Sequence, residues 1–186
     1  MSDNLSEALK LLALAGPEGS RPLSRLERGK PVAPGRDAVL KSSLDPLVQS
    51  ALFLYFDCFV ESHNIAQDHE GTVGNWLHAI AHRREPDAWN SKYWYARVKI
   101  PPKVSQEIAQ GALKVLETDP SQELAALRKK LVNSGEWEPE TFVELCDKAR
   151  KEDPKKLTYK TLAQIQEIEW RALLEFAAGN KKTPSR

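Results

Sequence analysis

Apolar residues recur at helical spacing along almost the whole chain, and the alternation typical of β-strands is nearly absent. The longest apolar run, 51–60, is interrupted only by Asp57. Upstream of it, Asp45 followed by Pro46 is a helix-start signal, and we expect a helix from 46 to about 67. This helix is apolar nearly all the way round, which indicates burial. The pattern predicts an all-α protein, a helical bundle around a buried antiparallel helix hairpin.

The second arm of this hairpin is predicted at 74–85. Gly71 and Gly74 mark the turn before it, and Pro86 ends it. The connection is short, so the two helices are expected to be antiparallel neighbours. A third helix is predicted from Asp87, a good N-cap residue, to about Val98.

The remaining sequence predicts shorter elements around the hairpin. Amphipathic helices are expected at 104–117, 120–133, 139–151 and 158–178. The N-terminal part combines a small helix at 4–15 with a Pro/Gly-rich arm at 17–37. We therefore divide the chain into an N-terminal helix and arm (1–43), a helical domain (44–180) and a disordered tail (181–186).

Composition narrows the functional classes. The 186 residues carry a formal net charge of +1, which argues against nucleic-acid binding by charge alone. The two cysteines form no CxxC pair, so neither a disulfide framework nor a cysteine-ligated zinc site is expected. No apolar run is long enough to cross a bilayer, and the N-terminus lacks a basic signal-peptide region. We expect a cytoplasmic protein without a membrane or nucleic-acid partner.

All four histidines fall within residues 63–82, and two of them suggest a metal site. His78 and His82 share one stripe of the second helix, and Asp57 and Glu61 share one stripe of the first. Two imidazoles and two carboxylates suit zinc, iron or manganese. In this hypothesis His78, His82 and Glu61 hold the ion, and Asp57 or His63 completes the ligand set.

Two other geometries stay open. His63 points about 200° away from Glu61 on the same helix, so a site of His63, His78 and His82 excludes the carboxylates. Alternatively, Glu61 or Asp57 forms a structural ion pair with Arg83 or Arg84, and the cluster has no function beyond packing.

The Arg-Arg-Glu-Pro-Asp segment, 83–87, supplies the candidate catalytic residues Arg84, Glu85 and Asp87. Arg84 is expected to stabilise an anionic substrate or transition state while a metal-bound water acts as the nucleophile of a hydrolase-type reaction. The structural alternative is a helix corner in which cations and an acid cap two helix ends.

Aromatic and basic residues after this corner predict a ligand pocket. Its cations would hold a phosphate or carboxylate, and a ring would stack on a flat group. The candidate ligand-binding residues are Arg83, Trp89, Asn90, Lys92, Tyr93, Trp94 and Arg97. Two functions therefore compete: a metal-dependent hydrolase acting on a small anionic ligand, and a non-enzymatic interaction module in which exposed Trp and Tyr side chains bind a protein partner or anionic ligand.

The segments YFDCFVESHNIAQ and WLHAIAHRREPDAWNSKYWYARV resemble an uncharacterised family of bacterial and fungal proteins. Its members share a pattern close to W-H-x-I-x-H-R-R-E-x-D-x-x-N-x-K-Y-W, preceded by E-S-H-x-I-x-Q. The resemblance covers residues 50–98, and here Leu77 stands between Trp76 and His78, where the pattern has none. No activity is established for the family, so the resemblance implies where a site lies and not its chemistry.

Overall fold

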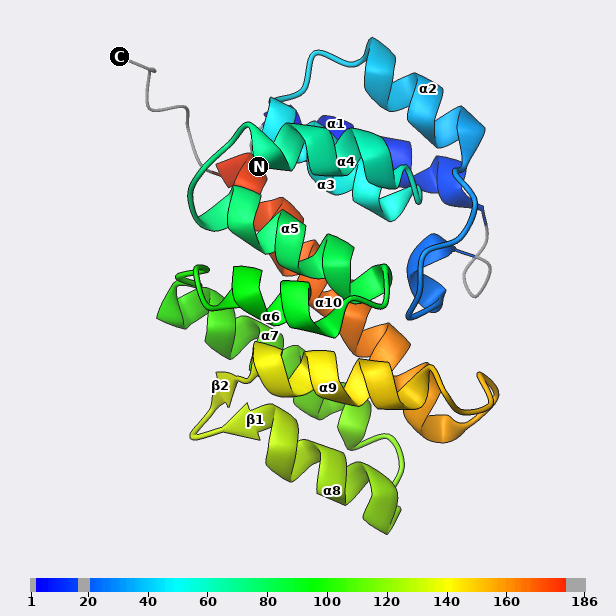
Figure 1. The fold of residues 1–186 in the computed structure, drawn as a ribbon, viewed down its shortest axis with the longest axis vertical. Helices are drawn as coiled ribbons and strands as arrows, with labels where there is room; N and C mark the ends of the chain where they lie inside the picture. Colours follow the sequence, from blue (N-terminus) through cyan, green and yellow to red (C-terminus); the bar gives the residue numbers. More distant parts are fainter. Residues whose placement is uncertain (1–2, 17–20, 180–186) are drawn as a thin grey trace.

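The computed structural model describes residues 3–16 and 21–179, and within them the fold is all-α, as predicted (Figure 1). The α-helices are α1 (Asp3–Leu11), α2 (Ala33–Lys41), α3 (Pro46–Tyr55), α4 (Phe59–Gln67), α5 (Thr72–Arg84), α6 (Ala88–Tyr95), α7 (Pro102–Leu116), α8 (Gln122–Leu131), α9 (Pro139–Ala149) and α10 (Leu157–Gly179). Short 3₁₀ turns lie at Leu12–Ala15 and Pro22–Ser24.

A small β-hairpin between α8 and α9 was not predicted. β1 (Val132–Asn133) pairs antiparallel with β2 (Glu136–Trp137), and Val132 lies opposite Trp137. The two turn residues, Ser134 and Gly135, both have positive φ, at 51° and 83°. That backbone suits the tight turn of a two-residue hairpin.

The long helix α10 passes diagonally behind the other helices (Figure 1) and packs against α3, α5, α7 and α9. It is buried along its length, and the indole of Trp170 donates a 2.9 Å hydrogen bond to the Ala51 carbonyl of α3. Helices from both halves of the sequence are thus held against one central helix, which positions the α4–α5–α6 layer that carries the candidate site.

The predicted single helix at 46–67 is wrong, because the chain breaks between Tyr55 and Phe59 into α3 and α4. Asp57 adopts a φ of 58°, in the left-handed region that non-glycine residues rarely enter. Its carboxylate is held by two arginines from other segments, Arg84 at 2.7 Å and Arg25 at 2.8 Å. Tertiary contacts therefore stabilise this break, and the sequence at 55–59 contains no proline or glycine that would have predicted it.

The predicted helix starts at Asp45 and Asp87 are confirmed. The Asp45 side chain accepts a 3.0 Å hydrogen bond from the Leu47 amide, and the Asp87 side chain accepts one of 3.1 Å from the Asn90 amide. Both caps satisfy backbone donors that a helix N-terminus leaves without an intrahelical partner.

The described part of the predicted arm is packed against the domain. The backbone amide of Arg28 donates to the Arg84 carbonyl, that of Val32 donates to the Phe56 carbonyl, and α2 begins at Ala33, inside the range predicted as an arm. Residues 17–20 and the predicted tail at 181–186 lie outside the described residues. No helix among those described has the length and apolar character needed to cross a membrane.

Candidate functional site

Three histidines meet between α4 and α5. His63 comes from α4, and His78 and His82 lie one turn apart on α5. The ring centroids of His63 and His78 are 4.7 Å apart, those of His63 and His82 5.6 Å, and those of His78 and His82 6.1 Å. We call these residues the histidine cluster. It corresponds to the three-histidine alternative rather than to the histidine–carboxylate arrangement.

Aromatic and amide groups surround this cluster. His78 stacks on Trp94 of α6 at 4.3 Å between centroids, and His63 stacks on Phe59 at 5.6 Å. The amide nitrogen of Asn90 lies 3.2 Å from Nε2 of His82. Packing against rings from α4 and α6 thus holds the imidazoles in place.

Burial keeps the α5 histidines neutral. It lowers the pKa of His78 to about 4, with further lowering by His63 and His82. Burial also lowers the pKa of His82, helped by His63 and opposed by Glu85. The Gly74 backbone acts in the other direction and raises the pKa of His78, although no hydrogen bond of good geometry reaches Nδ1 of His78. Near neutral pH, both side chains are therefore uncharged imidazoles.

The structure does not bring the predicted carboxylate ligands to the histidine cluster. Asp57 faces Arg84 and Arg25, and Glu61 pairs with Arg36 of α2. Among the residues that the structure describes, no group of three or more His, Cys, Asp or Glu side chains is already arranged to hold a metal ion.

Arg83 and Arg84 are both fully buried and point to different partners. Arg83 pairs with Glu169 of α10 at 2.6 Å and donates a 2.7 Å hydrogen bond to the Tyr95 hydroxyl. Glu169 also accepts from the Tyr95 hydroxyl and the Trp76 indole. The side chains of this network are almost fully buried, and no sequence signal pointed to Glu169, 86 residues from Arg83.

Arg84 secures the N-terminal arm instead of facing the cluster. Besides Asp57, it donates to the carbonyls of Leu54, Pro22 and Glu27, at 3.0–3.1 Å. It is 1% exposed, so the cation that the sequence assigned to an anionic transition state is out of reach of any substrate. The hydrolase-type reaction stays a prediction, and Arg84 is no longer part of it.

Three more of the predicted site residues, Glu85, Asp87 and Lys92, also form ion pairs or cap a helix. Glu85 lies 3.2 Å from Arg28 and 3.6 Å from Nδ1 of His82. Asp87 caps α6, and Lys92 pairs with Glu144 of α9 at 3.0 Å. Of these, only Glu85 contacts the histidine cluster.

A polar cleft of about 410 Å³ opens beside the cluster. His78, Tyr93, Trp94 and Arg97 line it, so four of the predicted site residues meet there. Its other lining residues are Ala66, Gln67, His69, Glu70, Gly71 and Asn75. The sequence analysis placed none of these among the candidate site residues, although Asn75 lies three residues before His78, about one helical turn away on α5.

Exposed aromatic residues continue from this cleft along α6. Trp89 is 74% exposed, and its ring stacks on that of Tyr93 with centroids 5.9 Å apart. The Arg97 guanidinium lies over the Tyr93 ring at 3.5 Å. Trp89 and Tyr93 are four residues apart on α6, which places them one above the other on one side of the helix, and Arg97 lies two residues beyond the end of α6.

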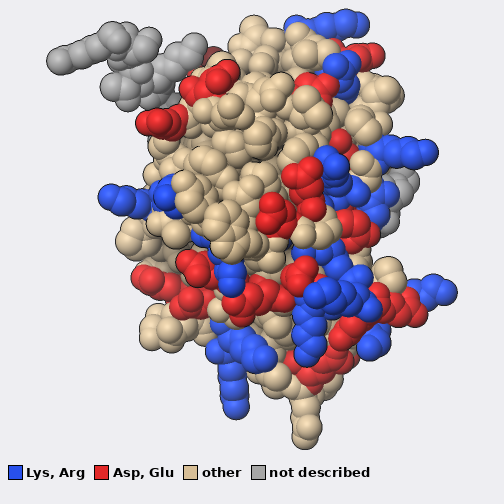
Figure 2. All heavy atoms as spheres, in the orientation of Figure 1, with Lys and Arg blue, Asp and Glu red and all other residues tan. Residues whose placement is uncertain are grey.

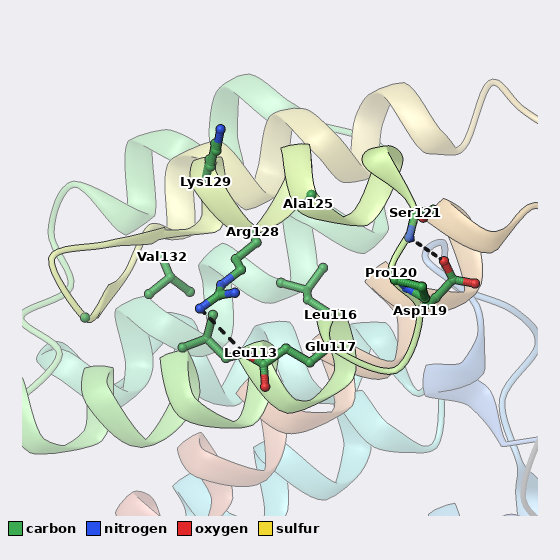
Figure 3. A pocket seen from close by; sticks show the side chains of 11 residues that line it. Leu113, Leu116, Glu117, Asp119, Pro120, Ser121, Ala125, Arg128, Lys129 and Val132 are labelled. Carbon is green, nitrogen blue, oxygen red and sulfur yellow. Dashed lines mark hydrogen bonds and ion pairs between the residues drawn. The ribbon is translucent and has the colours of Figure 1, made fainter.

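A larger groove of about 650 Å³ lies elsewhere, between α7 and α8 (Figure 3). Leu116, Val132 and Leu113 point into it, and an ion pair of 3.5 Å joins Glu117 to Arg128 across it. It contains none of the predicted site residues. On the face shown in Figure 2, both charge signs are interspersed over the lower half, and uncharged surface gathers over α4, α5 and α6.

Comparison with known proteins found no match to this chain. No family model, no curated protein and no solved structure matches it.

Proposed function

We propose that this chain binds a small anionic ligand in the cleft between the α4–α5 connection and α6. The proposal is carried by the meeting of Arg97, Trp94 and His78 on the walls of one cavity of about 410 Å³. Cavities of roughly 300–1,000 Å³ suit small molecules, and a few convergent polar groups give them specificity.

Arg97 supplies the positive charge for such a ligand. Its guanidinium rests on Tyr93, and its Nη1 donates a 2.8 Å hydrogen bond to the Tyr93 carbonyl. The Asn75 amide donates to the Arg97 carbonyl at 3.3 Å, which ties this segment to α5. No carboxylate within the described residues forms an ion pair with Arg97. An oriented guanidinium with free N–H donors suits a carboxylate or phosphate.

A carboxylate among the lining residues limits where negative charge can lie. Glu70 lines the same cleft, with the amide side chains of Gln67 and Asn75 and the imidazole of His78. A carboxylate at Glu70 repels an anion nearby, so the ligand is expected to carry its charge at the Arg97 end. Its uncharged, hydrogen-bonding part then faces the amides and His78.

The test uses benzoate and inorganic phosphate as probes, with backbone amide shifts of the full-length protein measured by NMR. Benzoate is expected to shift amides of 67–71 and 93–97 most. Arg97→Gln is expected to weaken binding at least about tenfold, since a hydrogen bond to a charged group contributes about 1.5–3 kcal/mol. Arg128→Gln is the matched control, because it removes an exposed arginine that lines the α7–α8 groove.

Two results would contradict the proposal. One is the absence of shifts in the cleft with either probe at concentrations that do not denature the protein. The other is equal weakening by Arg97→Gln and Arg128→Gln, which would mean that the probes respond to overall charge.

A second candidate is the interaction module, and the exposure of Trp89 favours it. A tryptophan that is 74% exposed and stacked on a second ring resembles the aromatic anchors enriched in protein interfaces. The test compares partners retained from cell extract by the wild-type chain and by Trp89→Ala. A defined partner that binds purified wild-type protein and not the variant supports this function, and equal binding by both contradicts it.

A further inference from the structure

The distances between the imidazole rings of the histidine cluster are close to those between imidazoles that bind one metal ion. A zinc–nitrogen bond of about 2.0–2.1 Å puts each imidazole centroid about 3.2 Å from the ion, and two such centroids about 5 Å apart at the tetrahedral angle. The three observed separations are 4.7, 5.6 and 6.1 Å. Each of the three separations therefore differs by no more than about 1 Å from the value for two imidazoles bound to one zinc ion.

Groups from several segments lie against the two α5 histidines. A carboxylate oxygen of Glu85, the residue after α5, lies 3.6 Å from Nδ1 of His82, and a closer contact of this kind would orient the ring of a metal ligand. The side chain of His78 is held between Trp94 and the other two imidazoles, and its Nδ1 is buried without a hydrogen-bond partner. Nε2 of His82 is the atom that would bind the ion, and it would have to exchange its present 3.2 Å contact with the Asn90 amide nitrogen for that bond.

The two carboxylates that the sequence analysis offered as ligands do not reach the centre of the cluster. Asp57 and Glu61 are held by arginines of other segments. The rings around the cluster, those of Phe59 and Trp94, supply an apolar wall. His63 is half-buried, which leaves a route from solvent, and His78 also lines the cleft.

We infer that His63, His78 and His82 bind one divalent transition-metal ion, zinc first, with the fourth coordination position toward the cleft. Formation of the site needs the three rings to leave their present packing until one nitrogen of each points to a common centre. The inference goes beyond the proposed function, because it concerns the three imidazoles between α4 and α5 and holds whether or not an anion binds at Arg97.

The experiment titrates Co²⁺ into the 186-residue chain after a chelator has removed any bound metal. Tetrahedral Co²⁺ gives intense visible absorption, and Zn²⁺ added afterwards is expected to abolish it by displacement. We expect one equivalent of metal. His63→Ala, His78→Ala and His82→Ala are each expected to weaken binding at least about 100-fold, more than the 10–100-fold typical of losing a supporting residue.

Glu61→Gln is the matched control, because Glu61 lies two residues from His63 on α4 but pairs with Arg36. It is expected to leave Co²⁺ affinity unchanged, with no more than a twofold effect. Circular dichroism checks the fold of every variant. If a variant of a buried histidine does not fold, the half-buried His63 still decides the test.

Three results would overturn the inference. They are the absence of Co²⁺ or Zn²⁺ binding by the wild type, undiminished binding by folded His63→Ala, and loss of binding in Glu61→Gln comparable to that in His63→Ala. The last would point to the histidine–carboxylate geometry. Zinc binding without benzoate binding, or the reverse, separates this inference from the proposed function.

Discussion

Replacing Asp57 with Asn should destabilise the fold strongly and leave the candidate sites intact. The Asp57 side chain is fully buried and faces Arg84, which is 1% exposed. Asn keeps the size of the side chain and tolerates the left-handed backbone at φ 58°, so the substitution removes mainly the charge. Arg84 would then be a buried cation without its anion.

The expected loss is about 3 kcal/mol, at the lower end of the roughly 3–5 kcal/mol for breaking a buried ion pair. The lower end applies because Arg84 keeps its hydrogen bonds to three backbone carbonyls. For a chain of this length, about 2–4 °C per kcal/mol gives a fall in Tm of about 6–12 °C. Urea denaturation followed by circular dichroism measures the free energy of unfolding directly.

Glu61→Gln is the control, since the Glu61–Arg36 pair is partly exposed and should contribute at most about 1 kcal/mol. Benzoate and Co²⁺ binding should persist in Asp57→Asn at temperatures where it is folded. A loss of stability below about 1 kcal/mol would refute the account of the break between α3 and α4. Unchanged stability with lost metal binding would restore Asp57 as a ligand.

Three further predictions concern groups beside or behind the site. His78 should titrate by NMR near pH 4; because its folded pKa lies below the ordinary 6.5, its contribution to stability is complete above about pH 6.5 and is lost as the pH falls through about 4. Glu169→Gln should lower the free energy of unfolding by about 3–5 kcal/mol in a urea titration, because it leaves Arg83 buried and uncompensated. Gly74→Ala should cost about 1–3 kcal/mol in the same assay, since a Cβ there would lie 1.8 Å from the His69 carbonyl oxygen and the cleft wall would have to shift.

Much of the fold follows from local signals in the sequence. The last helix, predicted at 158–178, is observed at Leu157–Gly179, and the helix predicted at 139–151 is observed at Pro139–Ala149. Periodicity and capping residues act over a few residues, so they locate such elements without tertiary information.

Partners of buried charges could not be predicted in the same way. Arg83 and Arg84 are neighbours in sequence, but successive side chains on a helix point about 100° apart. One faces α10 and the other faces the N-terminal arm. The contact partners are 86 and 62 residues apart in the sequence. The local pattern around one partner therefore gives no information about the other partner.

The break at Asp57 also explains why the sequence left two site geometries open. In one continuous helix, His63 and the pair Asp57 and Glu61 lie at fixed angles, and only one set can face α5. The break separates Asp57 from the helix that carries His63, so the carboxylate can turn to Arg84 while α4 presents the imidazole to His78. Because a contact with an arginine 27 positions later stabilises the break, the same ion pair keeps Asp57 away from the histidine cluster and anchors the arm. A variant that restores a regular helix across 55–59 should therefore disturb the histidine cluster and the arm together, and Co²⁺ titration beside amide exchange at 22–28 would detect both.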